Sequence, residues 1–222
     1  MSDHLREMLA KAKGSAATAR VARLGDLLTP AAPVPEQERW GLEALRGRLV
    51  ELSALGATAT LTTSIELVLE AQRAAEPVAW VMLGNGTFYP PDAADSGVDL
   101  AALVVVRVVD TTTAARAAER LLRSGAFGLV VLDFGGGGVV EVPTAHLGRL
   151  VKLAQAHDAA VVCITEKSDD AASLGSLVSL RAEAMRQRER DHGYDVTLRV
   201  LKDKRRGPGW SRTIKLRGPA GF

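Results

Sequence analysis

The chain is short of cysteine, of aromatic residues and of long apolar runs. Its single cysteine excludes an intramolecular disulfide, and Cys163 lies within the apolar run 161–164, which predicts a buried thiol. Aromatic residues make up only 4% of the chain, so the core must be built from Val, Leu, Ile and Ala. No stretch approaches the roughly 18–20 apolar residues that cross a membrane, and residues 1–14 lack the apolar run of a signal peptide. We therefore expect no membrane partner and a cytoplasmic location, with association with the nucleoid left open.

What the chain does contain is ordinary for a globular protein, except in how its charge is distributed. Its 222 residues are 47% hydrophobic and 24% charged, which suits one α/β domain with tails. The net charge of +2 hides an asymmetry, because residues 181–222 carry 12 Lys and Arg against 5 Asp and Glu. That segment has a net charge of +7, and the rest of the chain has −5. A basic C-terminal segment on an acidic body indicates an anionic partner or an acidic protein surface.

The chain divides into four parts by pattern. Residues 1–28 place apolar side chains such as Leu5 and Leu9 at helical spacing, which predicts an amphipathic helix, and the proline-rich stretch 29–40 predicts a linker. In 41–180, runs that are apolar throughout alternate with helical patterns, which predicts βαβ units around a parallel sheet. The expected strands are 49–52, 78–83, 103–108, 128–132 and 159–165, and the expected helices are 61–75, 112–123 and 143–157. Asp110 is expected to cap the second of these helices, and Pro143 suits the first turn of the third.

After residue 170 the pattern changes, and polar and apolar residues alternate. The segments 174–180, 195–201 and 210–216 are expected strands, with a turn at 204–209. This predicts an antiparallel extension within the basic C-terminal segment, 181–222. The expected fold is therefore α/β, with a mostly parallel sheet flanked by helices and an antiparallel extension at its C-terminal end.

A strand, a short loop of small residues and an amphipathic helix follow one another at 47–63, which is the layout of a phosphate-binding loop. That motif is G-x-x-x-x-G-K-[ST], in which glycines let the backbone wrap the phosphates, lysine contacts them and a hydroxyl binds Mg²⁺. The four motif positions are occupied here by Ala54, Ala59, Thr60 and Leu61. All four depart from the motif, and Leu61 cannot bind a metal at all.

Four segments in register resemble the RecA family. They are 47–52 (GRLVEL), 78–81 (VAWV), 97–103 (GVDLAAL) with 110–111, and 124–133 (SGAFGLVVLD). In order, they resemble the segment before the RecA phosphate loop, the next strand, the stretch before the following helix, and the approach to the second nucleotide motif. The resemblance spans roughly residues 40–165 and implies a RecA-like core with a degenerate phosphate loop.

The chain also departs from the RecA pattern where chemistry is done. The catalytic glutamate of the family would fall near 83–85, where the chain has no carboxylate. Asp133 takes the Mg²⁺-associated position at a strand end, but without a lysine and a hydroxyl partner we expect it to cap the following loop. We therefore expect no ATPase activity, no cofactor and no catalytic residue.

One subgroup of RecA-like proteins lacks the same residues and is about this short. It is the ImuA type, also described as SulA-like, and the segment 198–209 (LRVLKDKRRGPG) resembles the ending of those proteins. The resemblance implies a catalytically inactive adaptor or regulator in SOS-type translesion DNA synthesis. The implied partners are a Y-family polymerase-like subunit of the ImuB type, an error-prone replicative-type polymerase and RecA itself.

The basic C-terminal hairpin is the clearest positive signal for binding. Its predicted binding residues surround one turn and are Arg199, Lys202, Lys204, Arg205, Arg206, Trp210, Arg212 and Lys215. Cations that contact phosphates beside an aromatic stacking platform suit single-stranded DNA, so a DNA-binding protein is the alternative function. The structural alternative is a solvated sheet edge that discourages pairing with other chains. A divergent nucleotide-binding enzyme is the second functional alternative.

Three further patterns point to no particular function. Gly84-Asn85-Gly86 predicts a tight turn, because Tyr89 takes the third glycine position of a dinucleotide motif. The four glycines at 135–138 fit either a binding loop or a plain surface loop. All four histidines are expected on the solvated surface, without a metal site.

Overall fold

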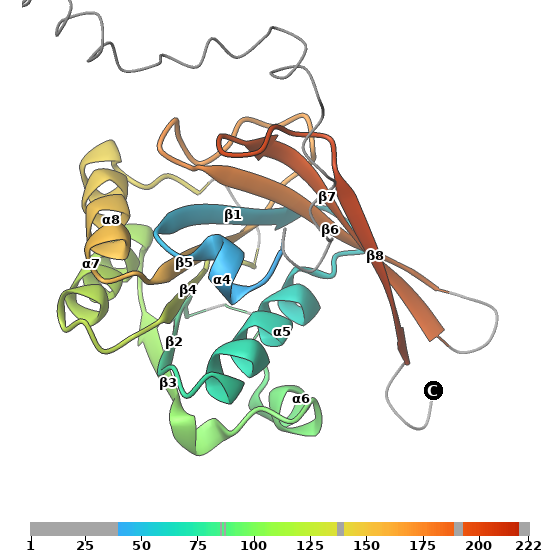
Figure 1. The fold of residues 1–222 in the computed structure, drawn as a ribbon, viewed down its shortest axis with the longest axis horizontal. Helices are drawn as coiled ribbons and strands as arrows, with labels where there is room; N and C mark the ends of the chain where they lie inside the picture. Colours follow the sequence, from blue (N-terminus) through green and yellow to red (C-terminus); the bar gives the residue numbers. More distant parts are fainter. Residues whose placement is uncertain (1–39, 85, 87, 137–139, 189–192, 218–222) are drawn as a thin grey trace, which may run out of the picture. The chain divides into compact units, whose positions relative to one another are not determined.

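The apolar runs of the sequence become the strands of a single eight-stranded sheet (Figure 1). The computed structural model describes residues 40–84, 86, 88–136, 140–188 and 193–217. The strands are β1 (Arg48–Ala54), β2 (Val78–Leu83), β3 (Leu103–Val108), β4 (Leu129–Asp133), β5 (Ala160–Glu166), β6 (Leu180–Arg188), β7 (Gly193–Asp203) and β8 (Ser211–Arg217). Their order across the sheet is β3-β2-β4-β5-β1-β6-β7-β8.

Strands β1 to β6 pair in parallel, whereas β7 is antiparallel to both β6 and β8. The helices are α4 (Leu42–Leu45), α5 (Thr60–Arg73), α6 (Pro90–Asp95), α7 (Thr111–Arg123) and α8 (Thr144–Ala156), with a 3-10 turn η1 (Leu100–Ala102). The predicted α/β architecture, with a mostly parallel sheet flanked by helices and antiparallel C-terminal strands, is confirmed. No helix in the described part of the chain combines the length and apolarity needed to cross a membrane.

Alternate residues of β1 to β5 feed two separate cores on the two faces of the sheet, whereas β6, β7 and β8 contribute only to the core beside α5. On β1, Val50 and Leu52 pack on the face that carries α5, and Leu49 packs on the face that carries α7 and α8. Figure 1 shows α5 and α6 on one side of the sheet and the α7–α8 pair on the other. Because both faces of the central strands are covered, β2 is apolar throughout and β4 is apolar up to Asp133, which is the pattern that the sequence showed.

Several local expectations are confirmed. Asp110 caps α7, because its Oδ1 accepts a hydrogen bond from the backbone N–H of Thr113 at 2.6 Å. Pro143 directly precedes the first residue of α8 and occupies its N-cap position. Cys163 is fully buried on β5, where burial raises the pKa of its thiol.

Two expectations are wrong. The segment 174–180 is not a strand: its apolar residues Leu174 and Leu177 pack from a loop, and the strand begins only at Leu180. His146 is not solvated, since α7 and α8 pack side by side and its Nδ1 lies 2.5 Å from Glu119 Oε1. Burial raises the pKa of Glu119, but hydrogen bonds from His146 and Arg149 outweigh it and leave that pKa lowered.

Two parts of the expected organisation lie outside the described residues. These are the amphipathic helix at 1–28 and the linker at 29–40, apart from Trp40, which is buried in the core beside α5. All the described residues belong to one unit, 36–222. The expected start of the basic C-terminal segment, 181, is the second residue of β6, which pairs with β1 in the middle of the sheet.

Candidate functional site

The loop that departs from the phosphate-loop motif joins β1 to α5. β1 lies between β5 and β6, so this loop leaves the C-terminal edge of the parallel strands, where ligands of open α/β sheets bind. Ala54 and Ala59 are buried, and Leu61 packs partly buried against the core beside α5. The four motif positions therefore lie where a phosphate loop needs them, but they present apolar side chains and one threonine.

The backbone of this loop is hydrogen-bonded to the neighbouring strand. The N–H of Ala59 donates to the carbonyl of Ala184 at 2.9 Å, and the N–H of Arg186 donates to the carbonyl of Ala57 at 2.9 Å. Between them, Thr58 forms an antiparallel bridge with Met185. A phosphate loop binds anions with N–H groups that point at the ligand. Here the loop continues the sheet beside β6, so the donor at position 59 is already used.

The threonines of the loop bond to each other. The Oγ1 atoms of Thr58 and Thr60 are 2.9 Å apart, and the N–H of Thr60 donates to Thr58 Oγ1 at 3.2 Å. Thr60 is also buried. The one hydroxyl left at the four motif positions thus closes the start of α5 and does not face a ligand space.

Asp133 ends β4 and is fully buried. Its Oδ1 accepts the N–H of Gly135 at 2.9 Å, and its Oδ2 accepts Trp80 Nε1 at 3.3 Å. The Trp80 ring in turn packs on Phe88, with ring centroids 4.8 Å apart. Burial raises the pKa of the Asp133 carboxyl, which these two hydrogen bonds only partly oppose. The geometry is that of a loop cap, as expected, and the partner Trp80 lies too far away in sequence to be inferred.

A buried carboxylate that sequence reasoning missed lies in the middle of β1. The Glu51 side chain is 0% exposed; its Oε1 accepts Lys167 Nζ at 2.5 Å and Thr165 Oγ1 at 3.0 Å. Its Oε2 accepts the N–H of Leu174 at 2.9 Å. A glutamate inside an apolar run was the available signal, because buried carboxylates require partners. Glu51 thus ties the central strand to the segment that follows β5.

Four cations bind the same segment, 168–176, through its oxygens. Arg181 donates to the carbonyls of Ser168 and Ala171, Lys167 to that of Ala172, Lys202 to Ser173 Oγ and the carbonyl of Gly175, and Lys204 to the carbonyl of Ser176. Burial, followed by the nearby Lys204 charge, lowers the pKa of the Lys202 ammonium. Lys202 and Lys204, both predicted to bind DNA or a partner, therefore also anchor this segment.

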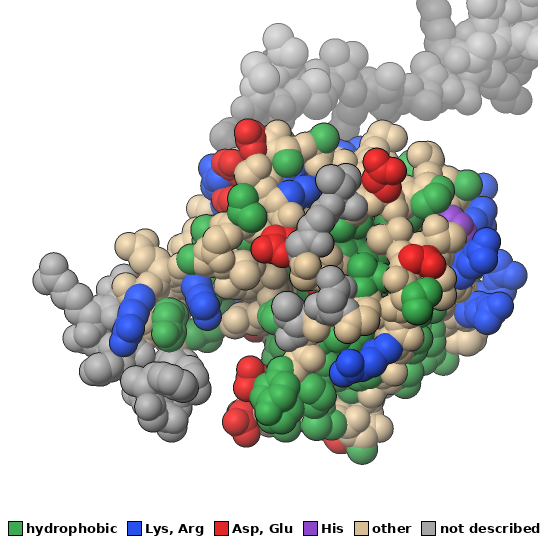
Figure 2. All heavy atoms as spheres, turned by 180° about the vertical axis from the view of Figure 1, so that it is seen from behind, with side chains coloured by type: hydrophobic (Ala, Val, Ile, Leu, Met, Phe, Trp, Pro, Cys, Tyr) green, Lys and Arg blue, Asp and Glu red, His purple; other side chains and the backbone are tan. Residues whose placement is uncertain are grey.

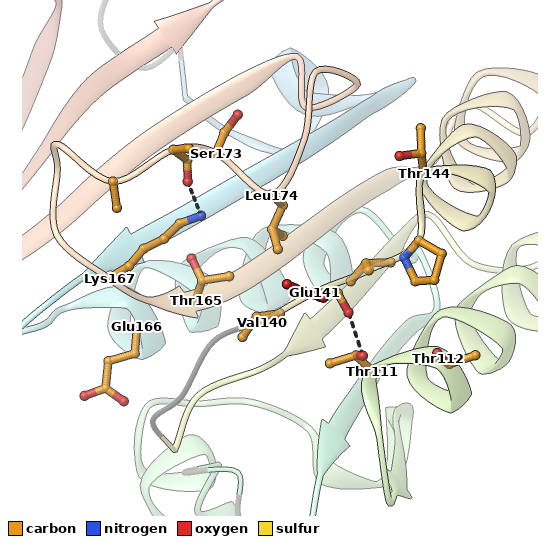
Figure 3. Close-up of a pocket in the computed structure, with 14 residues that line it drawn as sticks. Thr111, Thr112, Val140, Glu141, Thr144, Thr165, Glu166, Lys167, Ser173 and Leu174 are labelled. Atoms are coloured by element: carbon orange, nitrogen blue, oxygen red, sulfur yellow. Dashed lines mark hydrogen bonds between the residues drawn. The ribbon is translucent and has the colours of Figure 1, made fainter.

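A cavity of about 830 Å³ opens between this segment, the end of β5 and the N-terminal ends of α7 and α8 (Figure 3). Its lining is rich in hydroxyl groups, from Thr111, Thr112, Thr144, Thr165 and Ser173. Glu141 and Glu166 also line it, but Figure 3 shows the Glu166 carboxylate directed away from Thr165 and Lys167, and the Lys167 ammonium is already paired with Glu51. Because the hydroxyls are neutral and Lys167 is paired, this lining suits a neutral polar group better than a phosphate. In the described part of the chain, no three His, Cys, Asp or Glu side chains are placed to hold a metal.

The predicted basic residues of the C-terminal hairpin do not share one surface. On β7, Val196, Leu198 and Val200 are buried on the α5 side, as the alternation predicted. Arg199 faces the opposite side, where its Nη2 lies 2.7 Å from Glu183 Oε2 and 2.6 Å from Asp169 Oδ2. Pairing across the sheet places exposed Lys215 on the same side as Arg199.

Two of the predicted residues lie on the α5 side instead. Arg212 Nη2 is 3.6 Å from Glu66 Oε2, on the surface of α5. Trp210 packs partly buried against the core beside α5, so its ring is not a freely exposed stacking platform. Neither residue is placed to act together with Arg199 or Lys215 on one ligand.

The turn holds the remaining three, Lys204, Arg205 and Arg206, all exposed. It is fixed by a buried ion pair between β1 and the end of β7, in which Arg48 Nη2 lies 2.6 Å from Asp203 Oδ1. Arg205 also reaches the carbonyls of Arg46 and Gly47, at 3.4 and 3.5 Å. The turn is therefore a compact basic surface at the end of the sheet away from the degenerate loop.

Comparisons of the chain with protein-family models and with curated proteins find no match. The resemblance to RecA-like proteins therefore remains an expectation from the sequence segments alone.

Proposed function

We propose that the chain is a catalytically inactive RecA-like adaptor or regulator in SOS-type translesion DNA synthesis. Its partners would be a Y-family polymerase-like subunit of the ImuB type, RecA, or both, together with an error-prone replicative-type polymerase. The observation that carries the proposal is the loop after β1. It keeps the place of a phosphate loop between a central strand and an amphipathic helix, but it is hydrogen-bonded to β6 and lacks every motif side chain.

Two further features support the absence of nucleotide chemistry. Asp133 is fully buried and both of its oxygens accept hydrogen bonds from the protein itself, so the carboxylate serves as a loop cap and is not presented on the surface to a Mg²⁺ ion. Leu83 and Gly84, at the end of β2, bring no carboxylate to the place where a catalytic glutamate would activate water. A RecA-like core without these groups supports a role in binding other proteins.

The test uses the purified full-length chain. We expect no ATP hydrolysis with or without single-stranded DNA, and capture of the polymerase-like subunit in a pull-down with the untagged partner. ATP turnover that disappears in Asp133→Ala would overturn the inactive assignment. A thermal shift with millimolar Mg-ATP would favour a divergent nucleotide-binding enzyme.

The exposed turn favours DNA binding as a second candidate function. The salt dependence of binding measures the number of phosphate contacts. On single strands, the logarithm of the binding constant falls against the logarithm of the salt concentration with a slope of about −0.7 per contact. The exposed cations Lys204, Arg205, Arg206 and Lys215 would give a slope of about −3, whereas all seven predicted cations would give about −5. Charge reversal at Lys204, Arg205 and Arg206 should abolish this binding, and absent or salt-independent binding would reject the candidate.

A further inference from the structure

The two edges of the sheet differ sharply in how they are protected. β8, at one edge, carries a basic residue at every second or third position, namely Arg212, Lys215 and Arg217. β3, at the other edge, reads Leu-Val-Val-Val-Arg-Val, with a single charge, no proline and no bulge in its pairing with β2. Natural sheets protect edges with charge, proline or bulges, because an open edge pairs with other strands. β8 is protected in this way and β3 is not.

Side chains on both faces of β3 are exposed. Val104 lies on the α7 side and is 43% exposed; Val105 lies on the α5 side and is 40% exposed. Leu100, just before the strand, and Val109, just after it, are 41% and 88% exposed. Seen from behind, apolar side chains reach the surface at the lower end of the molecule, where Figure 1 places β3 and α6 (Figure 2). Among the described residues, no strand pairs with the outer side of β3.

Exposed apolar residues stand at both ends of the strand as well as within it. Leu100 lies just before β3, Val104 and Val105 lie in its first half, and Val109 lies directly after it. A two-fold axis through the middle of the strand would therefore bring the apolar end of one copy to the apolar start of another. Such self-complementarity is what an isologous interface requires.

We propose that β3 pairs with β3 of a second copy of this chain, antiparallel, to form a continuous sheet across a two-fold axis. The axis must be perpendicular to the sheet, so that each face of one copy continues as the same face in the other. In the allowed registers, therefore, an odd-numbered residue always lies opposite an odd-numbered residue and an even-numbered residue opposite an even-numbered one. The register centred on Val105 sets Val105 opposite itself and Leu103 opposite Arg107. The inference does not depend on the proposed function.

The chain supplies a clean background for a crosslinking test. Residues directly opposite each other in antiparallel strands have Cα atoms about 4.5–5.5 Å apart, which lies within the range that a disulfide spans. The native Cys163 is fully buried and does not interfere. Val105→Cys should therefore form a symmetric disulfide dimer under mild oxidation.

Val109→Cys is the matched control, because Val109 is more than twice as exposed as Val105. In the proposed register the two copies of residue 109 are eight strand positions apart, about 27 Å. The Val109→Cys protein should therefore stay uncrosslinked under the same oxidation. If side-chain exposure alone decided the rate, Val109→Cys would crosslink faster than Val105→Cys. That result would overturn the proposal.

Oligomeric state gives the second readout. The full-length chain at tens of micromolar should have about twice its 23.5 kDa mass by light scattering. Val105→Lys should halve that mass, whereas Leu55→Lys, at an exposed apolar residue on the loop after β1, should leave it unchanged. Circular dichroism would show that both variants fold. A wild-type chain that is monomeric at this concentration, or a dimer that survives Val105→Lys, would refute β3 pairing between copies.

Discussion

The ion pair between Arg48 and Asp203 connects the central strand to the basic hairpin, and its removal should be costly. Both side chains are almost fully buried, 2% and 1% exposed, and their closest atoms are 2.6 Å apart. Arg48 also donates to Ser179 Oγ at 3.0 Å, and Asp203 Oδ1 accepts the N–H of Arg205 at 2.9 Å. The pair thus fixes the start of β1, the residue before β6 and the end of β7 together.

Asp203→Ala leaves the guanidinium buried without its counter-charge, which costs about 3–5 kcal/mol of unfolding free energy. Replacing both partners by apolar residues, Arg48→Met with Asp203→Leu, should recover at least half of that loss, because desolvating the pair was itself costly. Urea unfolding followed by the fluorescence of the three tryptophans measures both values. A single-variant cost below 1 kcal/mol, or a double variant no more stable than Asp203→Ala, would refute the reasoning.

The pH dependence gives an independent check of the same pair. Burial raises the pKa of Asp203, but hydrogen bonds from the Arg205 backbone and from Arg48 outweigh it, so the folded pKa is lowered. An aspartate whose folded pKa lies below its unfolded value stabilises the protein above that unfolded value, about 3.9. The stability gap between wild type and Asp203→Ala should therefore be constant from pH 5 to 8. It should shrink as the pH falls below about 4.

Three further predictions test other buried groups. Glu51→Gln removes one acceptor and the charge that holds Lys167, so it should lower the unfolding free energy by about 1–3 kcal/mol and speed amide hydrogen exchange in 168–176. Unchanged exchange in that segment would contradict the anchoring role of Glu51. Burial raises the folded pKa of Asp133, so its contribution to the unfolding free energy falls as the pH rises from about 4 through that folded pKa. Asp133→Asn should remove this decrease in the unfolding free energy, measured by urea unfolding between pH 4 and 7.5. An unchanged decrease would assign it to another group. Burial also raises the pKa of Cys163, so the native thiol should not react with a disulfide reagent until the protein unfolds, and rapid native labelling would show that the thiol is accessible.

The parallel part of the sheet could be predicted because its signal is local. A strand covered on both faces must be apolar at every position, and 78–83 shows this so clearly that its predicted bounds match β2. Caps are local too, which is why Asp110 was found three residues from the N–H that it binds. Each of these features needs only a few neighbouring residues to be recognised.

β6 was missed because its local preference points the wrong way. Its sequence, Leu-Arg-Ala-Glu-Ala-Met-Arg-Gln-Arg, consists of residues that favour helices, and only its pairing with β1 and β7 makes it a strand. The apolar residues just before it, Leu174 and Leu177, suggested a strand, but they pack onto the core beside α8 from a loop. The prediction of a strand at 174–180 was therefore wrong in backbone conformation.

The partners of the basic residues could not be predicted because they lie far away in sequence. Arg199 bonds to Asp169, 30 positions earlier, and Arg212 contacts Glu66 on α5. A count of charges in 181–222 treats such cations as free for phosphate, whereas the fold divides them among two faces and a turn. The net charge of the segment is therefore a poor measure of the charge that it presents to a ligand.

The pairing of the degenerate loop with β6 makes a prediction that side-chain loss alone does not. If only side chains were missing, restoring the motif with Ala54→Gly, Ala59→Gly, Thr60→Lys and Leu61→Thr should restore Mg-ATP binding. Because the N–H of residue 59 and the carbonyl of residue 57 are held by Ala184 and Arg186, we expect the restored loop to remain closed. Binding at 0.1 mM affinity would stabilise the protein by about 2 kcal/mol at 5 mM ATP, which a thermal shift detects. The expected result is no shift in the fourfold variant, with folding verified by circular dichroism. A clear shift would mean that the β6 contacts yield to the nucleotide, and that the side chains at the four motif positions alone decide whether this loop binds it.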